Sequence, residues 1–187
     1  NYFKAGPATS KSRRNRIINP SQPYGKFYVA GNYVDGFPEI TKDNWAGGVQ
    51  CNHPDSAKVA QAYTVVAIPS NTAQQAYEQV LAFAGASHMR DAVDARIVNE
   101  VKSGNPVNGK NKNGIIDSQA EVGGWPELKA TTAPKDIDKD GMPDAWELKY
   151  KLNPNSADDA AKYTLEKQYT NLEVYLNSLV NTDPKVK

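Results

Sequence analysis

One twelve-residue segment, 136–147, constrains the fold of this chain more than any other part of its sequence. It reads Asp-Ile-Asp-Lys-Asp-Gly-Met-Pro-Asp-Ala-Trp-Glu and matches the pattern D-x-D-x-D-G-x5-E at every defined position. A calcium ion takes about six to eight oxygen ligands, and this spacing brings carboxylates and one main-chain carbonyl around a single centre. We therefore predict a calcium site with these ligands: Asp136, Asp138, Asp140, the Met142 carbonyl, Asp144 (directly or through water) and a bidentate Glu147.

The residues around this calcium loop (residues 136–147) predict half of an EF-hand rather than a paired one. Pro143 has no N–H to donate, which disfavours the short β-bridge that joins two EF-hands. Residues 130–135 do not read as the end of an incoming helix, whereas Pro143 suits the first turn of an outgoing one. The loop is therefore expected to act alone as a structural clamp. The alternative is an acidic solvated turn without metal, which the completeness of the match disfavours.

A second segment, 111–117, looks similar but does not qualify as a calcium loop. If Gly114 were the turn glycine, Gly109 and Ala120 would occupy the first and last ligand positions, and neither has a side chain that can coordinate. A plain glycine-rich turn is the better interpretation.

The order of patterns along the chain is strand-like first and helical later. Short runs at 16–18, 26–29 and 32–34 are separated by turn residues, and strand-like stretches leading into Asn recur faintly, as stacked turns of a solenoid would leave them. Capping signals and apolar stripes then predict three helices, with a loop-like composition over 104–135 between the second and third. These helices are expected over 72–84, over 91–103 after the cap Asp91, and from the Thr170–Glu173 capping box onward, where Leu172, Tyr175, Leu176 and Leu179 form a stripe that should dock.

Composition excludes two classes of partner. The chain carries 22 basic and 21 acidic residues, a formal charge of +1, which argues against nucleic-acid binding. No apolar run reaches about eighteen residues, so we expect no membrane span. A calcium site of modest affinity fits an extracellular location better than the cytosol.

Other residues with catalytic or sugar-binding chemistry have weaker support. His53 and His88 have no Ser or Cys motif beside them, so a hydrolase triad is not indicated. The basic cluster of Arg13, Arg14 and Arg16 could hold carboxylates, although a solvated turn is the favoured interpretation. Three tryptophans offer sugar-stacking faces but are expected in the core, with the last anchoring the outgoing helix: Trp45, Trp125 and Trp146.

Segments spread over nearly the whole chain carry the motifs of one enzyme family. They are 1–9 (Asn-Tyr-Phe-Lys-Ala-Gly-Pro-Ala-Thr), 31–34 with 43–48, 90–98 (Arg-Asp-Ala-Val-Asp-Ala-Arg-Ile-Val), 115–126, 140–147, 152–155 and 169–176. Together they resemble the distal half of bacterial pectate lyases, especially those of pectin-degrading Gram-negative gut and soil bacteria. The resemblance implies a right-handed parallel β-helix and calcium-assisted β-elimination of de-esterified pectin, in which an arginine removes the C5 proton.

The fold expected from this resemblance is mainly β with a helical extension. Terminal rungs of the β-helix are expected over 1–70, a helical pair over 71–104, an irregular loop over 105–135, and the calcium loop with a C-terminal helical cap over 136–187. The expected protein is secreted, periplasmic or at the cell surface of a Gram-negative bacterium, and its substrate is polygalacturonate or pectin.

The resemblance also implies that no catalytic residue lies in this chain. In the family the basic arginine precedes an Asn-Tyr-Tyr-Lys-type motif, and this sequence begins at that motif. The cluster at 13–16 lacks the matching neighbours, and Arg90 belongs to the helical extension. We therefore expect an upstream fragment of the same lyase as a partner. The alternative is a non-enzymatic, calcium-stabilised carbohydrate-binding or adhesion module; cohesin-partner domains of that kind carry two calcium loops, and one good copy is present here.

Overall fold

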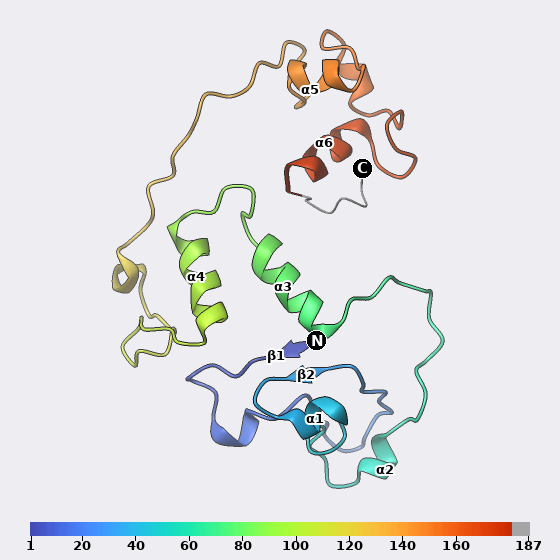
Figure 1. Ribbon diagram of the computed structural model, residues 1–187, viewed down its shortest axis with the longest axis vertical. Helices are drawn as coiled ribbons and strands as arrows, with labels where there is room; N and C mark the ends of the chain where they lie inside the picture. Colours follow the sequence, from blue (N-terminus) through green and yellow to red (C-terminus); the bar gives the residue numbers. More distant parts are fainter. Residues whose placement is uncertain (181–187) are drawn as a thin grey trace. The chain divides into compact units, whose positions relative to one another are not determined.

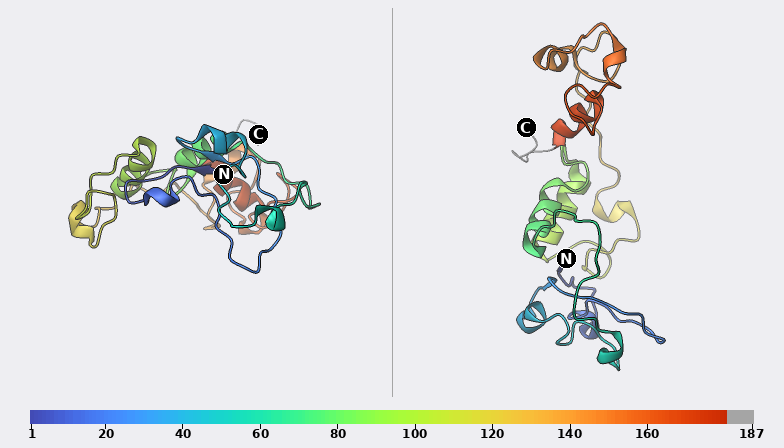
Figure 2. Two further views of the ribbon diagram at one scale, coloured as in Figure 1. Left: turned by 90° about the horizontal axis from the view of Figure 1, so that it is seen from below. Right: turned by 90° about the vertical axis from the view of Figure 1, so that its right-hand side faces the viewer.

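The computed structural model describes residues 1–180 of the 187, and these form helices and long loops with one short pair of strands (Figures 1 and 2). The chain divides into two compact units. The first joins Asn1–Ala84 to Asp91–Pro126, and the second joins Gly85–Arg90 to the chain from Glu127 onward. The four sequence regions expected above stay a prediction.

The strands of the first unit are only two residues long. β1 (Tyr2–Phe3) pairs in parallel with β2 (Tyr33–Val34), and isolated parallel bridges join Ile18 to Val49 and Phe27 to Lys58. Asn1 and Asn32, which are 31 positions apart, also share a hydrogen bond of 2.9 Å between their side chains. Two of the recurring Asn-containing stretches, 1–3 and 31–34, thus lie beside each other in parallel register.

The predicted mainly β fold, with terminal rungs of a right-handed parallel β-helix over 1–70, is wrong. Within residues 1–180 the only sheet is the β1–β2 pair, and the rest is helix, turn and loop. Proline and glycine explain the short strands. Pro20 and Pro23 cannot donate to a ladder, and Gly31 and Gly36 turn the chain with φ of +70° and +80°. The helices were expected to cap these rungs, and residues 1–180 contain no such rungs for them to cover.

The first unit also contains two short helices and a pair of buried asparagines. α1 (Pro38–Lys42) and α2 (Pro54–Ala57) both begin with proline, as suits a first helical turn. Asn44, which is buried, donates to the carbonyls of Asn32 at 2.9 Å and of Ile40 at 2.8 Å and accepts from the Asn32 N–H at 3.0 Å. The small apolar core of this unit is formed by Val34, Ile40, Val49, Ala57 and Ala73.

The two predicted helices in the middle of the chain are confirmed. α3 (Ala73–Phe83) begins with a Thr72–Gln75 capping box, and α4 (Ala92–Ser103) is capped by Asp91 and ends at the left-handed Gly104. Tyr2 of β1 stacks between Tyr33 and the α3 residue Tyr77, with ring centroids 4.6 and 4.3 Å away. Aromatic stacking therefore joins the two strands to α3.

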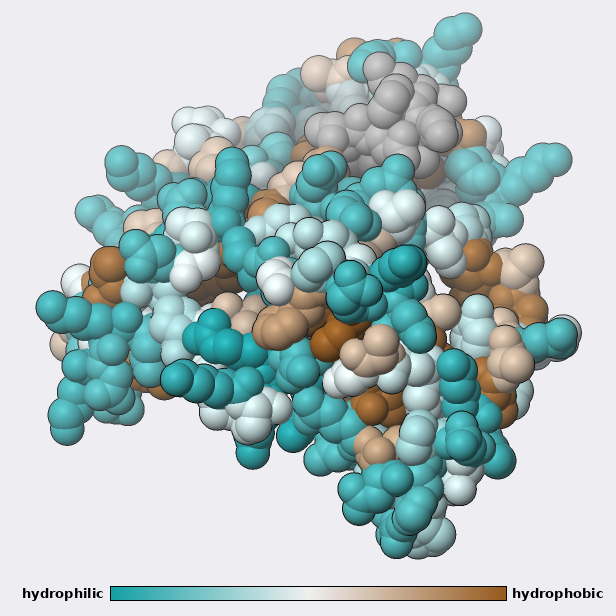
Figure 3. Space-filling view, turned by 60° about the horizontal axis from the view of Figure 1, so that its bottom comes forward, coloured by the Kyte–Doolittle hydropathy of each residue, from teal (hydrophilic) through white to brown (hydrophobic). Residues whose placement is uncertain are grey.

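The segment rejected as a calcium loop is a glycine turn, as predicted. Gly109 and Gly114 have φ of +83° and +85°, the Lys112 N–H donates to the Gly109 carbonyl, and the Gly114 N–H donates to that of Asn108. Two 3-10 turns complete the first unit, η1 (Lys11–Arg13) and η2 (Gln119–Val122). On the face shown in Figure 3, hydrophobic residues form small groups separated by hydrophilic ones.

The second unit contains α5 (Asp144–Lys149), η3 (Ala157–Asp159) and α6 (Asn171–Val180). The predicted capping box of α6 is present: the Thr170 N–H donates to Glu173 at 2.7 Å, and the Glu173 N–H donates to the Thr170 hydroxyl at 3.3 Å. The apolar stripe of α6 docks in its first half only. Leu172 and Tyr175 are half-buried, whereas Leu176 and Leu179 are exposed.

Trp146 anchors α5 to α6 as expected. Its ring lies 4.5 Å from that of Tyr150 and 5.1 Å from that of Tyr175. Trp125 departs from the expected core position, because 81% of it is exposed. Through residue 180, no helix has both the length and the apolar character needed to cross a bilayer.

Candidate metal centre

The first half of the calcium loop is folded around Asp136. Its carboxylate accepts the Lys139 N–H at 2.7 Å with one oxygen and the Gly141 N–H at 3.1 Å with the other. Asp140 accepts the Met142 N–H at 2.8 Å. Lys139 and Gly141 both have positive φ, +62° and +97°, which tightens the turn and brings the aspartates to one side.

The second half of the loop enters α5 at Pro143, which is the residue that precedes the helix rather than its first residue. The helix turn then carries Glu147 back toward the aspartates, and Glu147 is 0% exposed. Met142 is also fully buried. The residues before the loop are not helical, as the half EF-hand interpretation predicts.

Carboxylate oxygens gather in two overlapping groups. One oxygen from each of Asp136, Asp138 and Asp140 lies within 4.8 Å of the others, and the same holds for Asp140, Glu147 and Asp159. Several of these oxygens are buried without a hydrogen-bond partner among residues 1–180. They are both oxygens of Asp138, both of Glu147, Oδ2 of Asp140 and Oδ1 of Asp159.

Burial and repulsion raise the pKa of two residues, Asp140 and Glu147, of this acidic cluster (Asp136, Asp138, Asp140, Glu147 and Asp159). Burial, followed by the charges of Asp138 and Asp140, raises the pKa of Glu147 to about 7. Burial also raises the pKa of Asp140, against the Met142 N–H, which lowers it. Both shifts mean that the folded chain without a cation resists carrying full negative charge here.

Asp144 differs from the other acidic residues of the loop. Oδ1 accepts the Ile137 N–H at 2.8 Å, Oδ2 lies 3.1 Å from the Lys135 ammonium, and the Asp144 N–H donates to the Lys135 carbonyl at 2.9 Å. Burial acts to raise its pKa, but the Ile137 N–H and Lys135 outweigh it and lower the pKa. Asp144 thus fastens the entrance of the loop to the start of α5.

The donor set fits a hard divalent cation. The converging atoms are carboxylate oxygens, the ligand type of Ca²⁺ and Mg²⁺, and the cluster contains neither sulfur nor imidazole. Buried carboxylates without partners are costly unless they are paired or coordinate a metal. The arrangement can therefore hold a cation and exchange the repulsion among its carboxylates for attraction to a shared charge.

Four of the six residues predicted as ligands lie together: Asp136, Asp138, Asp140 and Glu147. Asp144 is occupied by Lys135 and Ile137 instead. The loop pattern did not include Asp159, which lies twelve positions after Glu147 and joins the same cluster. The one available signal was that Asp158 and Asp159 are the next acidic residues along the chain, and this does not distinguish the buried one from the exposed one.

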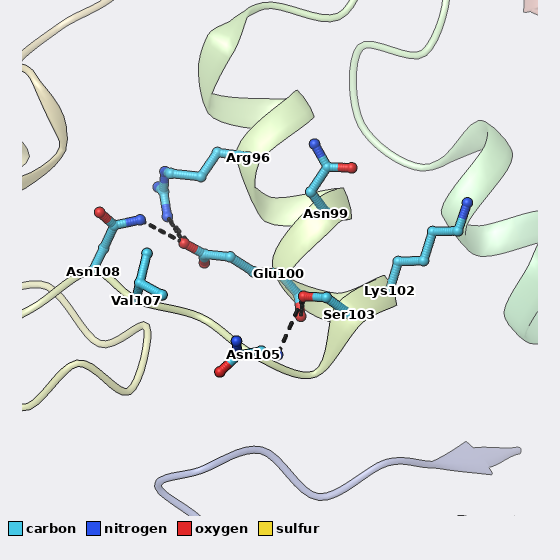
Figure 4. Close-up of a pocket in the computed structure, with 8 residues that line it drawn as sticks. All are labelled: Arg96, Asn99, Glu100, Lys102, Ser103, Asn105, Val107 and Asn108. Carbon is cyan, nitrogen blue, oxygen red and sulfur yellow. Dashed lines mark hydrogen bonds and ion pairs between the residues drawn. The ribbon is translucent and has the colours of Figure 1, made fainter.

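A hollow in the first unit gives less reason to expect a ligand. It has a volume of about 530 Å³ and lies at the end of α4, between Arg96, Glu100 and Asn108 (Figure 4). The Arg96 guanidinium pairs with Glu100 at 3.1 Å, and the Asn108 amide donates to the same carboxylate at 2.7 Å. These three side chains already form hydrogen bonds and an ion pair with one another.

Comparison with known proteins gives a consistent result. No family model matches the chain, and no solved structure matches it. Among curated proteins, it is 33% identical over 182 residues to a probable pectate lyase C of Aspergillus fumigatus and 35% identical over 183 residues to that of Aspergillus flavus. The corresponding protein of Emericella nidulans is 31% identical over 182 residues.

These alignments cover 96% of this chain but 41% of each relative, so the chain spans about two-fifths of the length of the proteins it matches. All of these relatives are fungal, and they lend no support to the expected Gram-negative source. Over nearly its whole length, the chain is therefore related to proteins named pectate lyase.

Proposed function

We propose that this chain is the distal part of a secreted pectate lyase and that it binds one structural calcium ion at residues 136–147. The observation that carries the lyase assignment is the similarity to proteins named probable pectate lyase C over 96% of the chain. The proposed reaction of the whole protein removes the C5 proton of a polygalacturonate unit and expels the C4 oxygen, leaving an unsaturated uronate.

The proposed calcium site has a structural role within the chain. Its carboxylates converge, Asp136, Asp138 and Asp140 are half-buried, and Glu147 is fully buried, so a bound ion would fasten the calcium loop to α5 rather than present itself to a polysaccharide. When bound, the ion supplies the positive charge that these carboxylates lack. The base that attacks the C5 proton is proposed to lie outside residues 1–187.

The test of the lyase assignment compares the whole protein with the 187-residue chain on polygalacturonate, following the ultraviolet absorbance of unsaturated uronates. Turnover is expected from the whole protein and not from the chain alone. Turnover by the chain alone would contradict the placement of the base, and no turnover by either would contradict the lyase assignment. Calorimetric titration of the chain with calcium tests the metal site independently.

A non-enzymatic carbohydrate-binding module is the second candidate, and the exposure of Trp125 favours it. A large aromatic ring that is 81% exposed offers a face on which a sugar can stack. Trp125→Ala is expected to weaken retention on immobilised polygalacturonate if this role is correct. Trp146→Ala is not a suitable control because Trp146 packs α5 on α6, so Tyr63→Ala, which also removes an exposed ring, takes that place.

A further inference from the structure

Asp159 lies outside the calcium loop, and its carboxylate faces into the acidic cluster. We propose that Asp159 is a direct ligand of the calcium ion and that Asp144 is not, its carboxylate serving instead as a clasp between residues 135–137 and α5. This inference rests on the calcium site proposed above and changes its ligand set. It makes the site a product of two chain segments rather than of one twelve-residue loop.

The position of Asp159 is that of a ligand. The residue is 7% exposed, and Oδ2 accepts the Asn153 N–H at 2.9 Å. Oδ1 is buried, has no hydrogen-bond partner within residues 1–180, and belongs to the residue that lies within 4.8 Å of both Asp140 and Glu147. Two oxygens bound to one calcium at about 2.3–2.6 Å each lie at most about 5 Å apart. One ion can therefore contact all three carboxylates.

A dedicated set of hydrogen bonds holds Asp159 in this position. Asn171, which is fully buried at the start of α6, donates its amide to the Asp159 carbonyl at 2.8 Å. The same side chain accepts the Thr164 and Leu165 N–H groups at 3.2 and 3.1 Å. The Leu172 N–H donates to the next carbonyl along the chain, that of Ala160, at 3.1 Å. Segment 159–165 is thereby fixed against α6, and a fixed carboxylate loses little freedom when it binds an ion.

The ammonium partner of Asp144 argues against direct coordination. Oδ2 of Asp144 lies 3.1 Å from the Lys135 ammonium and Oδ1 accepts the Ile137 N–H, whereas the two oxygens of Asp136 accept main-chain N–H groups, which carry no net charge. Asp144 belongs to neither group of converging carboxylates. An ion bound directly to Asp144 would also lie close to a lysine ammonium, which repels it.

Calcium titration of single variants by calorimetry, with the full chain, tests the proposal. Asp159→Asn keeps the size of the side chain and removes the charge, and it is expected to weaken calcium binding by about tenfold to a hundredfold. Asp158→Asn is the matched control, since its neighbouring carboxylate is exposed, and its affinity is expected to stay at the wild-type value. Asp144→Asn is expected to weaken binding less than Asp159→Asn does.

Thermal unfolding in chelator separates a ligand from a residue that only supports the fold. Without calcium, Asp159→Asn removes repulsion from the cluster, so its melting temperature is expected to equal or exceed that of the wild type in EGTA and to fall below it in calcium. A melting temperature lowered equally in both conditions would overturn the proposal. Wild-type calcium affinity in Asp159→Asn, together with loss of binding in Glu147→Gln, would also overturn the proposal while leaving the calcium site intact. A wild-type titration that shows no binding of calcium would overturn both the role of Asp159 and the calcium site.

Discussion

At the scale of single residues, the calcium loop depends on one glycine whose conformation no other residue adopts easily. Gly141 has a φ of +97°, and a Cβ placed there would lie 3.4 Å from Cδ1 of Leu172 at the start of α6. The Gly141 N–H also completes the hydrogen bonds around Asp136. Gly141 therefore contributes to the turn of the loop, to the hydrogen bonds of Asp136 and to the contact with α6.

Gly141→Ala is expected to lower the free energy of unfolding by about 1–3 kcal/mol, because alanine is strained at a φ of +97°. Urea denaturation in the presence of calcium measures it. Gly6→Ala is the control: a Cβ at Gly6 meets nothing within 4 Å, and its effect is expected to stay within about 0.5 kcal/mol. Equal effects of the two substitutions would contradict this account of the turn.

At the scale of elements, local signals predicted the helices well and the strands poorly. The caps of α3, α4 and α6 use side chains within three positions of the residues they bind, so Thr72, Asp91 and Thr170 are readable in the sequence. The parallel pairs join residues such as Asn1 and Asn32, 31 positions apart, and a partner at that distance cannot be read from local residue preference. Gly31 and Gly36, both with positive φ, flank β2 on its two sides.

The same contrast separates the two parts of the metal centre. The positions of Asp136, Asp138, Asp140 and Glu147 follow from a pattern confined to twelve residues, and these side chains do come together. Asp159 reaches the cluster through Asn171 and the residues between them, which is tertiary structure without a fixed spacing. Asp144 matches the pattern, but its carboxylate forms an ion pair with Lys135, a residue that precedes the loop.

The cap of α6 gives a dependence of stability on pH. Acceptance of the Thr170 N–H, and then of the Thr170 hydroxyl, lowers the pKa of Glu173 below its usual value of 4.5. A carboxylate with a lowered pKa in the folded chain contributes stability above that usual value and loses the contribution as the pH falls through the folded pKa. Glu173→Gln is therefore expected to destabilise the protein at neutral pH and to converge with the wild type in acid. Urea denaturation across this range measures it, and a constant difference would contradict it.

At the scale of the whole molecule, the chain consists of two compact units with different means of stabilisation. The first unit contains stacked tyrosines, a buried asparagine pair and a few apolar side chains. The second buries carboxylates beside its small helices. A divalent cation is expected to stabilise the second unit directly, since only that unit contains the acidic cluster.

Chelation of calcium is accordingly expected to act locally. In EGTA, amide hydrogen exchange should become faster in residues 136–149 and 153–172, because the proposed ion would no longer join them. Exchange in α3 and α4, which contain no residue of the acidic cluster, should change little. Mass spectrometry of the exchanged peptides measures both. Equal acceleration in α3 and α4 would contradict a local role for the ion.

The amide of Asn171 has a consequence for thermodynamic coupling. It joins the backbone of Asp159 to the first turn of α6, so under the proposed coordination, docking of that helix and capture of the ion share one hydrogen bond. Thermodynamic linkage is reciprocal: if docking of α6 increases the affinity for the ion by some factor, binding of the ion increases the equilibrium constant for docking of α6 by the same factor. Asn171, which is not a proposed ligand, would thus determine the coupling free energy between ion binding and docking of α6.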